Sequence, residues 1–161
     1  MVKRKILCLH GMRTSAAILS MQTAAMQYHT PLQFEFIDAP YDAVGPPDRG
    51  VAMFYPDHSY YEWFIRGSGD CHIGLDESLE YLIKHLKETG PYDGILGFSQ
   101  GVSMVTRLAR LQQMGNSRFG GLRLFEFVIS IGGVPPKDIE PVSEDTFHFN
   151  DEHFEKNNDL S

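Results

Sequence analysis

The feature that most constrains this chain is the pentapeptide Gly97-Phe98-Ser99-Gln100-Gly101, which has the pattern G-x-S-x-G. An apolar run that includes Ile95 and Leu96 precedes it, and a helical pattern over 100–114 follows it. A serine in this setting lies on a sharp turn between a strand and a helix, and the flanking glycines let the two approach closely. Backbone N–H groups and the dipole at the helix N-terminus favour negative charge beside the serine. The motif predicts that Ser99 is a nucleophile; the alternative is a chance match in a glycine-rich turn.

Strands and helices are predicted to alternate around this motif. The expected strands are continuous apolar runs, at Lys5–Leu9, Phe34–Asp38, Gly94–Gly97 and Phe125–Ile131. The expected helices have capping or stop signals, and run from Thr14 or Ser15 to about Gln27, from near Asp76 to Gly90-Pro91, and over Gln100–Met114. This alternation predicts one α/β domain with a parallel sheet, right-handed crossovers and helices on both faces in three layers.

Residues 39–70 have no clear period and are rich in proline and aromatic residues. A loop of this length is usually functional or disordered, and its aromatic content argues against disorder. We interpret it as a cap-like segment in which Tyr41 and Trp63 form an apolar wall for a substrate; the alternative is a loop that only packs over the sheet edge. The core is expected to span 1–136, and 137–161 is expected to be an acidic, weakly structured tail with at most one short strand.

Composition excludes several classes of function. Fourteen Lys and Arg residues against 21 Asp and Glu residues give a net charge of −7, so binding to a phosphate backbone is not expected. No run approaches the roughly 20 apolar residues of a spanning helix, so no membrane span is expected. Cys8 and Cys71 are expected to be free thiols, which favours a reducing compartment and a cytoplasmic location. We expect no metal and no cofactor.

The sequence Leu9-His10-Gly11-Met12 directly follows the first expected strand. Acyl transfer needs two N–H donors aimed at the oxyanion, and we expect them to be the backbone N–H groups of Met12 and Gln100. Gly11 lets the loop turn tightly, and both His10 and Gly11 are expected to lie beside bound substrate. His10 is also a candidate base, but its position at a strand end favours a structural role.

Several segments follow one another in an order that resembles a known family. They are Leu7-Cys8-Leu9-His10-Gly11, Asp38-Ala39-Pro40, Tyr60-Tyr61-Glu62-Trp63, Gly74-Leu75-Asp76-Glu77-Ser78-Leu79, the block Gly90–Gly101, and Ile131-Gly132-Gly133. Together they are similar to the FSH family of serine hydrolases, which includes the ovarian-cancer-associated esterase-like proteins. The resemblance covers about residues 3–136 and implies an α/β-hydrolase fold with a cytosolic or nuclear location. It also implies cleavage of acyl esters or thioesters, often long-chain ones, with Ser99 as the nucleophile.

The chain departs from this family after its fourth expected strand. The family takes its acid and base from loops after two further strands, in the order Ser, Asp, His. Here the only histidines after Ser99 are His148 and His153. We expect Asp151 as the acid and His153 as the base, although the family places these groups on separate loops.

On this interpretation the core is C-terminally truncated. An unpaired strand edge could then let copies of the chain associate. Two hypotheses remain. The chain is a serine hydrolase that acts through an acyl-Ser99 intermediate, or it is a catalytically impaired member of the family that binds acyl groups or a partner. A phosphate-binding site is less favoured, because no lysine follows the glycines as it does in a phosphate-binding loop.

Overall fold

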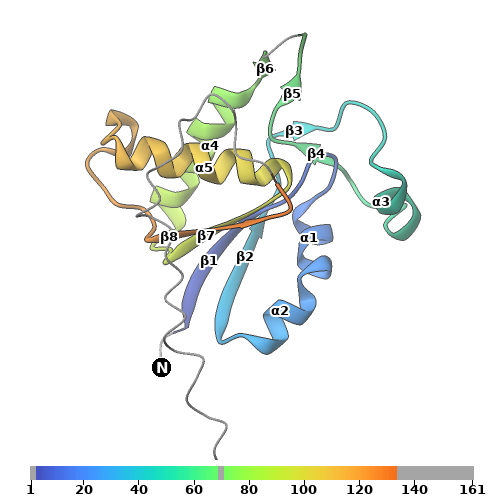
Figure 1. Cartoon of the computed structure of the whole chain (residues 1–161), viewed down its shortest axis with the longest axis horizontal. Helices are drawn as coiled ribbons and strands as arrows, with labels where there is room; N and C mark the ends of the chain where they lie inside the picture. The colour runs from blue at the N-terminus through green and yellow to red at the C-terminus, as the bar shows by residue number, and fades with distance from the viewer. Residues whose placement is uncertain (1–2, 69–70, 134–161) are drawn as a thin grey trace, which may run out of the picture.

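The computed structural model describes residues 3–68 and 71–133. Its main sheet has four strands, in the order β2-β1-β7-β8, and all of its pairings are parallel. The strands are β1 (Arg4–Leu9), β2 (Leu32–Ile37), β7 (Gly94–Phe98) and β8 (Phe127–Ile131). The predicted parallel sheet, with helices on both sides, is therefore confirmed (Figure 1).

The helices follow the predicted order with one difference. Three helices occupy the expected regions or part of them, α1 (Ala16–Gln22), α4 (Leu75–Thr89) and α5 (Gln100–Gln113). The first predicted helix is in fact two, because Thr23 leaves helical geometry (φ −101°, ψ 11°) and α2 (Ala24–His29) begins after it. The side chain of Ser15 caps α1 by accepting the N–H of Ile18.

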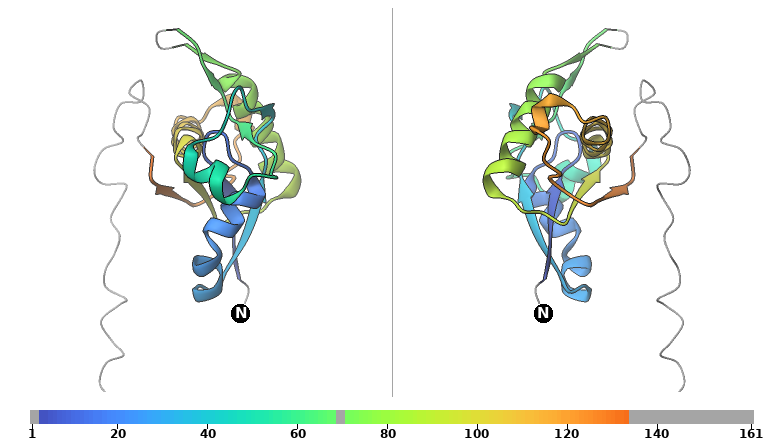
Figure 2. Two further views of the ribbon diagram at one scale, coloured as in Figure 1. Left: turned by 90° about the vertical axis from the view of Figure 1, so that its right-hand side faces the viewer. Right: turned by 90° about the vertical axis from the view of Figure 1, so that its left-hand side faces the viewer.

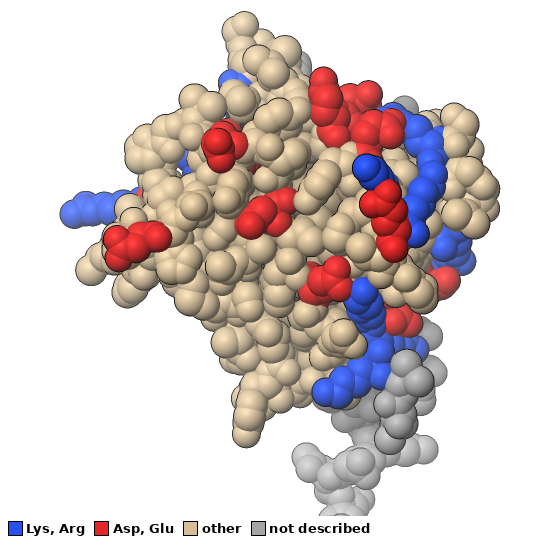
Figure 3. Space-filling view, turned by 180° about the vertical axis from the view of Figure 1, so that it is seen from behind, with Lys and Arg blue, Asp and Glu red and all other residues tan. Residues whose placement is uncertain are grey.

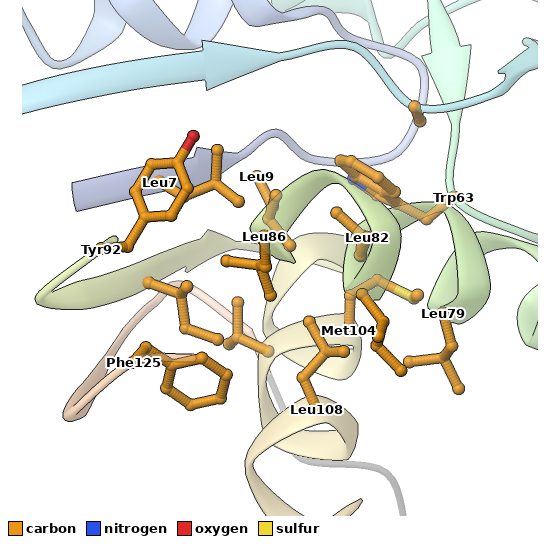
Figure 4. Close-up of a cluster of buried hydrophobic side chains, with 14 of the residues drawn as sticks. Leu7, Leu9, Trp63, Leu79, Leu82, Leu86, Tyr92, Met104, Leu108 and Phe125 are labelled. Carbon is orange, nitrogen blue, oxygen red and sulfur yellow. The ribbon is translucent and has the colours of Figure 1, made fainter. Parts of the chain in front are cut away.

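The alternation of side chains along β1 divides the core into two clusters. Leu7 and Leu9 face α4 and α5 and belong to the larger cluster, whereas Ile6 and Cys8 face the side that α1 covers. Figure 4 shows the larger cluster, with Trp63 at the end opposite Tyr92. Helices α1 and α2 lie on one side of the sheet and α4 and α5 on the other (Figure 1). In the two side views of Figure 2, α1 and α2 lie lower in the picture than α4 and α5.

Strand β8 forms one edge of the sheet within the described ranges. Its apolar side chains are only partly buried, and three of them pack against the smaller core cluster: Phe127, Ile129 and Ile131. The predicted short strand at Thr146–Phe149 lies outside the described residues. Among the described residues, no strand pairs with the outer edge of β8, and association of copies of the chain at this edge stays a prediction.

The segment 39–70 contains more regular structure than the sequence indicated. Strand β3 (Tyr41–Asp42) pairs with β4 (Tyr61–Glu62), and helix α3 (Arg49–Phe54) lies between them in the chain. Strand β5 (Ile65–Arg66) pairs with β6 (His72–Ile73) in a hairpin that projects from the body (Figure 1). These elements are too short for periodicity to reveal them. A short 3₁₀ helix, η1 (Ser117–Phe119), occupies the predicted polar turn after α5.

Surface charges are dispersed and frequently paired. On the face shown in Figure 3, basic side chains gather toward one side and acidic side chains lie among and beside them. Arg118 contacts both Asp76 and Glu80, and Lys5 contacts Glu35 at 2.8 Å. Cys8 is buried and Cys71 is exposed, and both are free thiols as expected. Over the ranges that the structure covers, no helix has the length and apolar character needed to cross a bilayer.

Candidate functional site

Ser99 occupies a strained backbone position between β7 and α5. Its φ of +52° is in the region that favours glycine, and its ψ is −112°. The N–H of Ser99 donates to the carbonyl oxygen of Ile131 at 3.0 Å, which fixes the turn to the neighbouring strand. Its hydroxyl does not cap α5, although the residue occupies the N-cap position. Strain held by surrounding structure is a common property of functional residues.

Glycines allow this turn to pack against the end of β1. A Cβ added at Gly97 would lie 2.5 Å from the carbonyl oxygen of Gly101, so helix α5 could not start where it does. A Cβ added at Gly11 would lie 3.2 Å from Cβ of Ser99. The two predicted loops, one after β1 and one after β7, therefore meet at Ser99, at the carboxyl edge of the sheet where α/β proteins bind ligands.

Ser99 opens onto a cleft of about 340 Å³. Gly11 and Thr14 line it from the loop after β1, Phe98 and Ser99 from the end of β7 and the turn after it, and Gln22 from α1. Helix α3 and the residues that flank it contribute the other lining residues, Asp48, Gly50, Val51, Phe54 and Tyr55. These five residues belong to the segment 39–70, but the sequence did not single them out as lining residues. The one signal available was Asp48, whose side chain caps α3 by accepting the N–H of Val51 at 3.0 Å.

His10 is fully buried, and both of its ring nitrogens are engaged. The N–H of Ala39 donates to Nε2 at 3.0 Å, so this nitrogen carries no proton. Nδ1 lies 2.7 Å from the carbonyl oxygen of Gly11, so its N–H donates there and the ring is neutral. Burial lowers the pKa of His10, although the hydrogen bond to Gly11 and the charge of Asp38 act in the opposite direction. The geometry gives His10 a structural role and leaves it no free nitrogen with which to contact substrate.

Two residues that we expected to bind substrate lie elsewhere. Trp63 is 0% exposed and packs in the larger core cluster, and its Nε1–H donates to the carbonyl oxygen of His10 at 2.8 Å. The ring of Tyr41 packs against Gly74 at the start of α4. Neither side chain lines the cleft, which corrects both expectations. In both cases tertiary packing, which has no local sequence signal, determines where the ring lies.

The two expected oxyanion donors come from the loops that meet at Ser99. Gln100 is the first residue of α5, so its N–H is one of the helix donors that have no partner within the helix. Met12 follows Gly11 in the loop after β1 and is 43% exposed. Its neighbour Arg13 has a φ of +54°, the only other positive φ at a non-glycine residue among those described.

The expected acid and base, Asp151 and His153, lie outside the described residues, as does His148. The described residues that line the cleft include no histidine. Within those same ranges, no group of three or more His, Cys, Asp or Glu side chains is placed to hold a metal ion. The structure therefore describes the surroundings of Ser99, and the roles of Asp151, His153 and His148 stay predictions.

A parallel sheet with helices on both faces, and a strained serine at its carboxyl edge, define an α/β-hydrolase-type fold. Comparison with protein families agrees: the model of the FSH1 serine hydrolase family matches residues 1–159. The chain belongs to this family.

Curated relatives support the same family assignment, and a solved structure supports the fold. The chain is 31% identical over 129 residues to esterase C25G4.2 of Caenorhabditis elegans, covering 78% of this chain and 58% of that protein. It is 32% identical over 162 residues to esterase OVCA2 of Bos taurus, covering 87% and 69%. The crystal structure of esterase PE8 matches the fold with a TM-score of 0.51 at 22% identity, over 66% of this chain and 51% of that one.

Proposed function

We propose that this chain carries the nucleophile of a serine hydrolase that cleaves carboxylic esters or thioesters, including long-chain acyl ones. The observation that carries the proposal is the backbone of Ser99, held at a φ of +52° on a strand–helix turn that opens onto the cleft. A serine held in this way presents its hydroxyl to a bound carbonyl group. Relatives that span this sheet are named esterases.

In the proposed reaction, Oγ of Ser99 attacks the acyl carbonyl carbon and its proton passes to a base. The backbone N–H groups of Met12 and Gln100 stabilise the oxyanion that forms. The tetrahedral intermediate then expels the alcohol or thiol, which takes up the proton, and water hydrolyses the acyl-serine ester. His153 is the proposed base and Asp151 the proposed acid, with His148 as the other candidate base.

A second candidate function is suggested by the residues that line the cleft. Because no histidine lines it among the described residues, the chain would be an acyl-binding or interaction module if the tail supplies no base. The chain spans 58% of the C. elegans relative, so the activity of the longer protein is not transferred to it. In that case the cleft would bind acyl groups without turning them over, since binding needs no base.

Labelling with a fluorophosphonate probe tests the two candidates. The active hydrolase should be labelled at Ser99, and Ser99→Ala should abolish the labelling. His153→Ala should lower the labelling rate by about a thousandfold, because a serine without its base loses several powers of ten, whereas His148→Ala should leave it unchanged. Labelling that persists in Ser99→Ala would refute the nucleophile assignment. A folded but unlabelled wild type would favour the binding module.

A further inference from the structure

The loop after β1 and the turn after β7, which carry the two proposed oxyanion donors, are both hydrogen-bonded to one short segment, Tyr61–Phe64. On the Met12 side, the N–H of Arg13 donates to the carbonyl oxygen of Tyr61 at 2.9 Å. The N–H of Tyr61 donates in turn to the carbonyl oxygen of Thr14 at 2.8 Å. The loop after β1 is thus paired, backbone to backbone, with the start of this segment.

Glu62 adds a side-chain attachment to the same loop. It is 2% exposed, and its Oε1 accepts a hydrogen bond from Nε of Arg13 at 2.7 Å. A second guanidinium nitrogen of Arg13 donates to the carbonyl oxygen of Pro46 at 3.0 Å. A buried carboxylate without its partner is strongly destabilising, so Glu62 and Arg13 hold each other in place. This contact also supports the uncommon positive φ of Arg13.

The side chain of Gln100 hydrogen-bonds the turn after β7 to the end of the segment Tyr61–Phe64. Its Oε1 accepts the N–H of Trp63 at 2.9 Å, and its Nε2 donates to the carbonyl oxygen of Phe64 at 2.8 Å. Gln100 is 7% exposed, so these two bonds satisfy its amide away from water. The residue that supplies one oxyanion donor through its backbone therefore holds the segment through its side chain.

We propose that Tyr61–Phe64 is a bracing segment that fixes the two oxyanion donors relative to each other, with the side chains of Glu62 and Gln100 as positioning residues. The inference rests on the proposed function. The donors come from loops after two different strands, and each must lie about 2.7–3.1 Å from the same oxygen. A displacement of about 1 Å at a reacting centre can lower a rate by roughly a hundredfold. A segment bonded to both loops limits such displacement.

The test compares labelling rates at Ser99 in folded variants. Gln100→Leu keeps the backbone N–H and removes both side-chain bonds, and Glu62→Ala removes the attachment to Arg13. Each should slow fluorophosphonate labelling by about 10–100-fold with little change in probe affinity. Glu62→Gln, which can still accept from Arg13, should restore most of the rate. The matched control is Glu35→Gln, which removes an ion pair with Lys5 on the sheet and should leave the labelling rate within about twofold.

Amide hydrogen exchange measured by NMR provides a second readout that does not depend on turnover. If the segment couples the two loops, Gln100→Leu should speed exchange of the Arg13 N–H by about tenfold, although Gln100 does not itself bond to Arg13. The bracing role alone is overturned if the wild type is labelled and Gln100→Leu and Glu62→Ala are labelled at the same rate. It is also overturned if the exchange rate of the Arg13 N–H is unchanged in Gln100→Leu. A wild type without labelling at Ser99 refutes the proposed function, and the exchange measurement then still decides whether the segment couples the loops.

Discussion

The backbone of Gly101 lies directly against the carbonyl oxygen of Leu9, with no room for a side chain between them. A Cβ at this position would also lie 3.0 Å from the carbonyl oxygen of His10. Helix α5 and the end of β1 therefore approach as closely as two backbones allow. This contact brings the loop after β1 to Ser99, which makes Gly101 a structural requirement of the site.

Gly101→Ala should lower the free energy of unfolding by about 2–3 kcal/mol, because the added methyl group meets backbone atoms that cannot move aside easily. Gly115→Ala is the control: Gly115 has a φ of +65° and open space around it, so only the backbone conformation opposes the change. Its cost should be about 1 kcal/mol. Urea denaturation of both variants checks the difference, and equal losses would contradict the close packing at Gly101.

The neutral ring of His10 predicts a specific dependence of stability on pH. Burial lowers the pKa of folded His10, whereas the unfolded residue titrates near ~6.5. Below that pH the unfolded chain binds a proton that the folded protein does not, so stability falls as the pH decreases toward the lowered pKa. This loss should begin as the pH falls through the unfolded value of ~6.5, and it should end once the pH lies below the lowered pKa of the folded residue.

A variant at His10 separates the contribution of this residue to the pH dependence of stability from those of the other histidines. His10→Asn removes the titrating ring, so the stability difference between wild type and variant should shrink as the pH falls. Denaturation curves at three pH values provide the measurement. Parallel pH dependences of the two proteins would show that His10 is not held neutral in the fold.

The edge of β8 predicts association between copies of the chain. Exposed edges pair readily through their free N–H and C=O groups, and a charged residue on the edge opposes such pairing. Ser130 is exposed on this strand, so Ser130→Lys should shift the full chain toward monomer. Sedimentation velocity over a range of concentrations checks this, and a wild type that stays monomeric would refute the expectation.

The parts of the molecule that were predicted from sequence have strong local signals. Apolar runs such as Lys5–Leu9 and the glycines around Ser99 identify the strands and the turn, because continuous burial and close approach restrict residue type. The position of Gly11 beside Ser99 could be inferred too, since parallel strands end at the same edge of the sheet. Local rules were sufficient here because each feature spans only a few neighbouring residues.

The walls of the cleft could not be predicted in this way. Trp63 and Phe54 both belong to an aromatic segment without a period, yet one is fully buried and the other is 74% exposed. The difference arises from long-range bonds, such as those from Trp63 to His10 and Gln100. The composition of such a segment is compatible with a functional role but does not say which of its rings line a cleft.

The exposed wall of the cleft leads to a prediction about acyl chain length. If a chain lies along α3, each added methylene should gain up to ~0.8 kcal/mol, roughly a fourfold rise in affinity, until the cleft is full. Phe54 lines the cleft and Met53 does not, although both are 74% exposed on the same helix. Phe54→Ala should therefore flatten the dependence on chain length, and Met53→Ala should leave it intact.

Binding can be measured without turnover in a Ser99→Ala background, by calorimetry with p-nitrophenyl esters from butyrate to dodecanoate. Because Phe54 is exposed, its truncation should change stability by no more than about 0.5 kcal/mol, so a flattened slope would report on binding. Trp63→Ala is unsuitable for this purpose, since emptying a buried site of that size costs about 3–5 kcal/mol. If Phe54→Ala and Met53→Ala give the same slope as the parent, the acyl chain does not lie along α3. If affinity does not rise with chain length in the parent itself, the cleft does not bind the acyl chain at all.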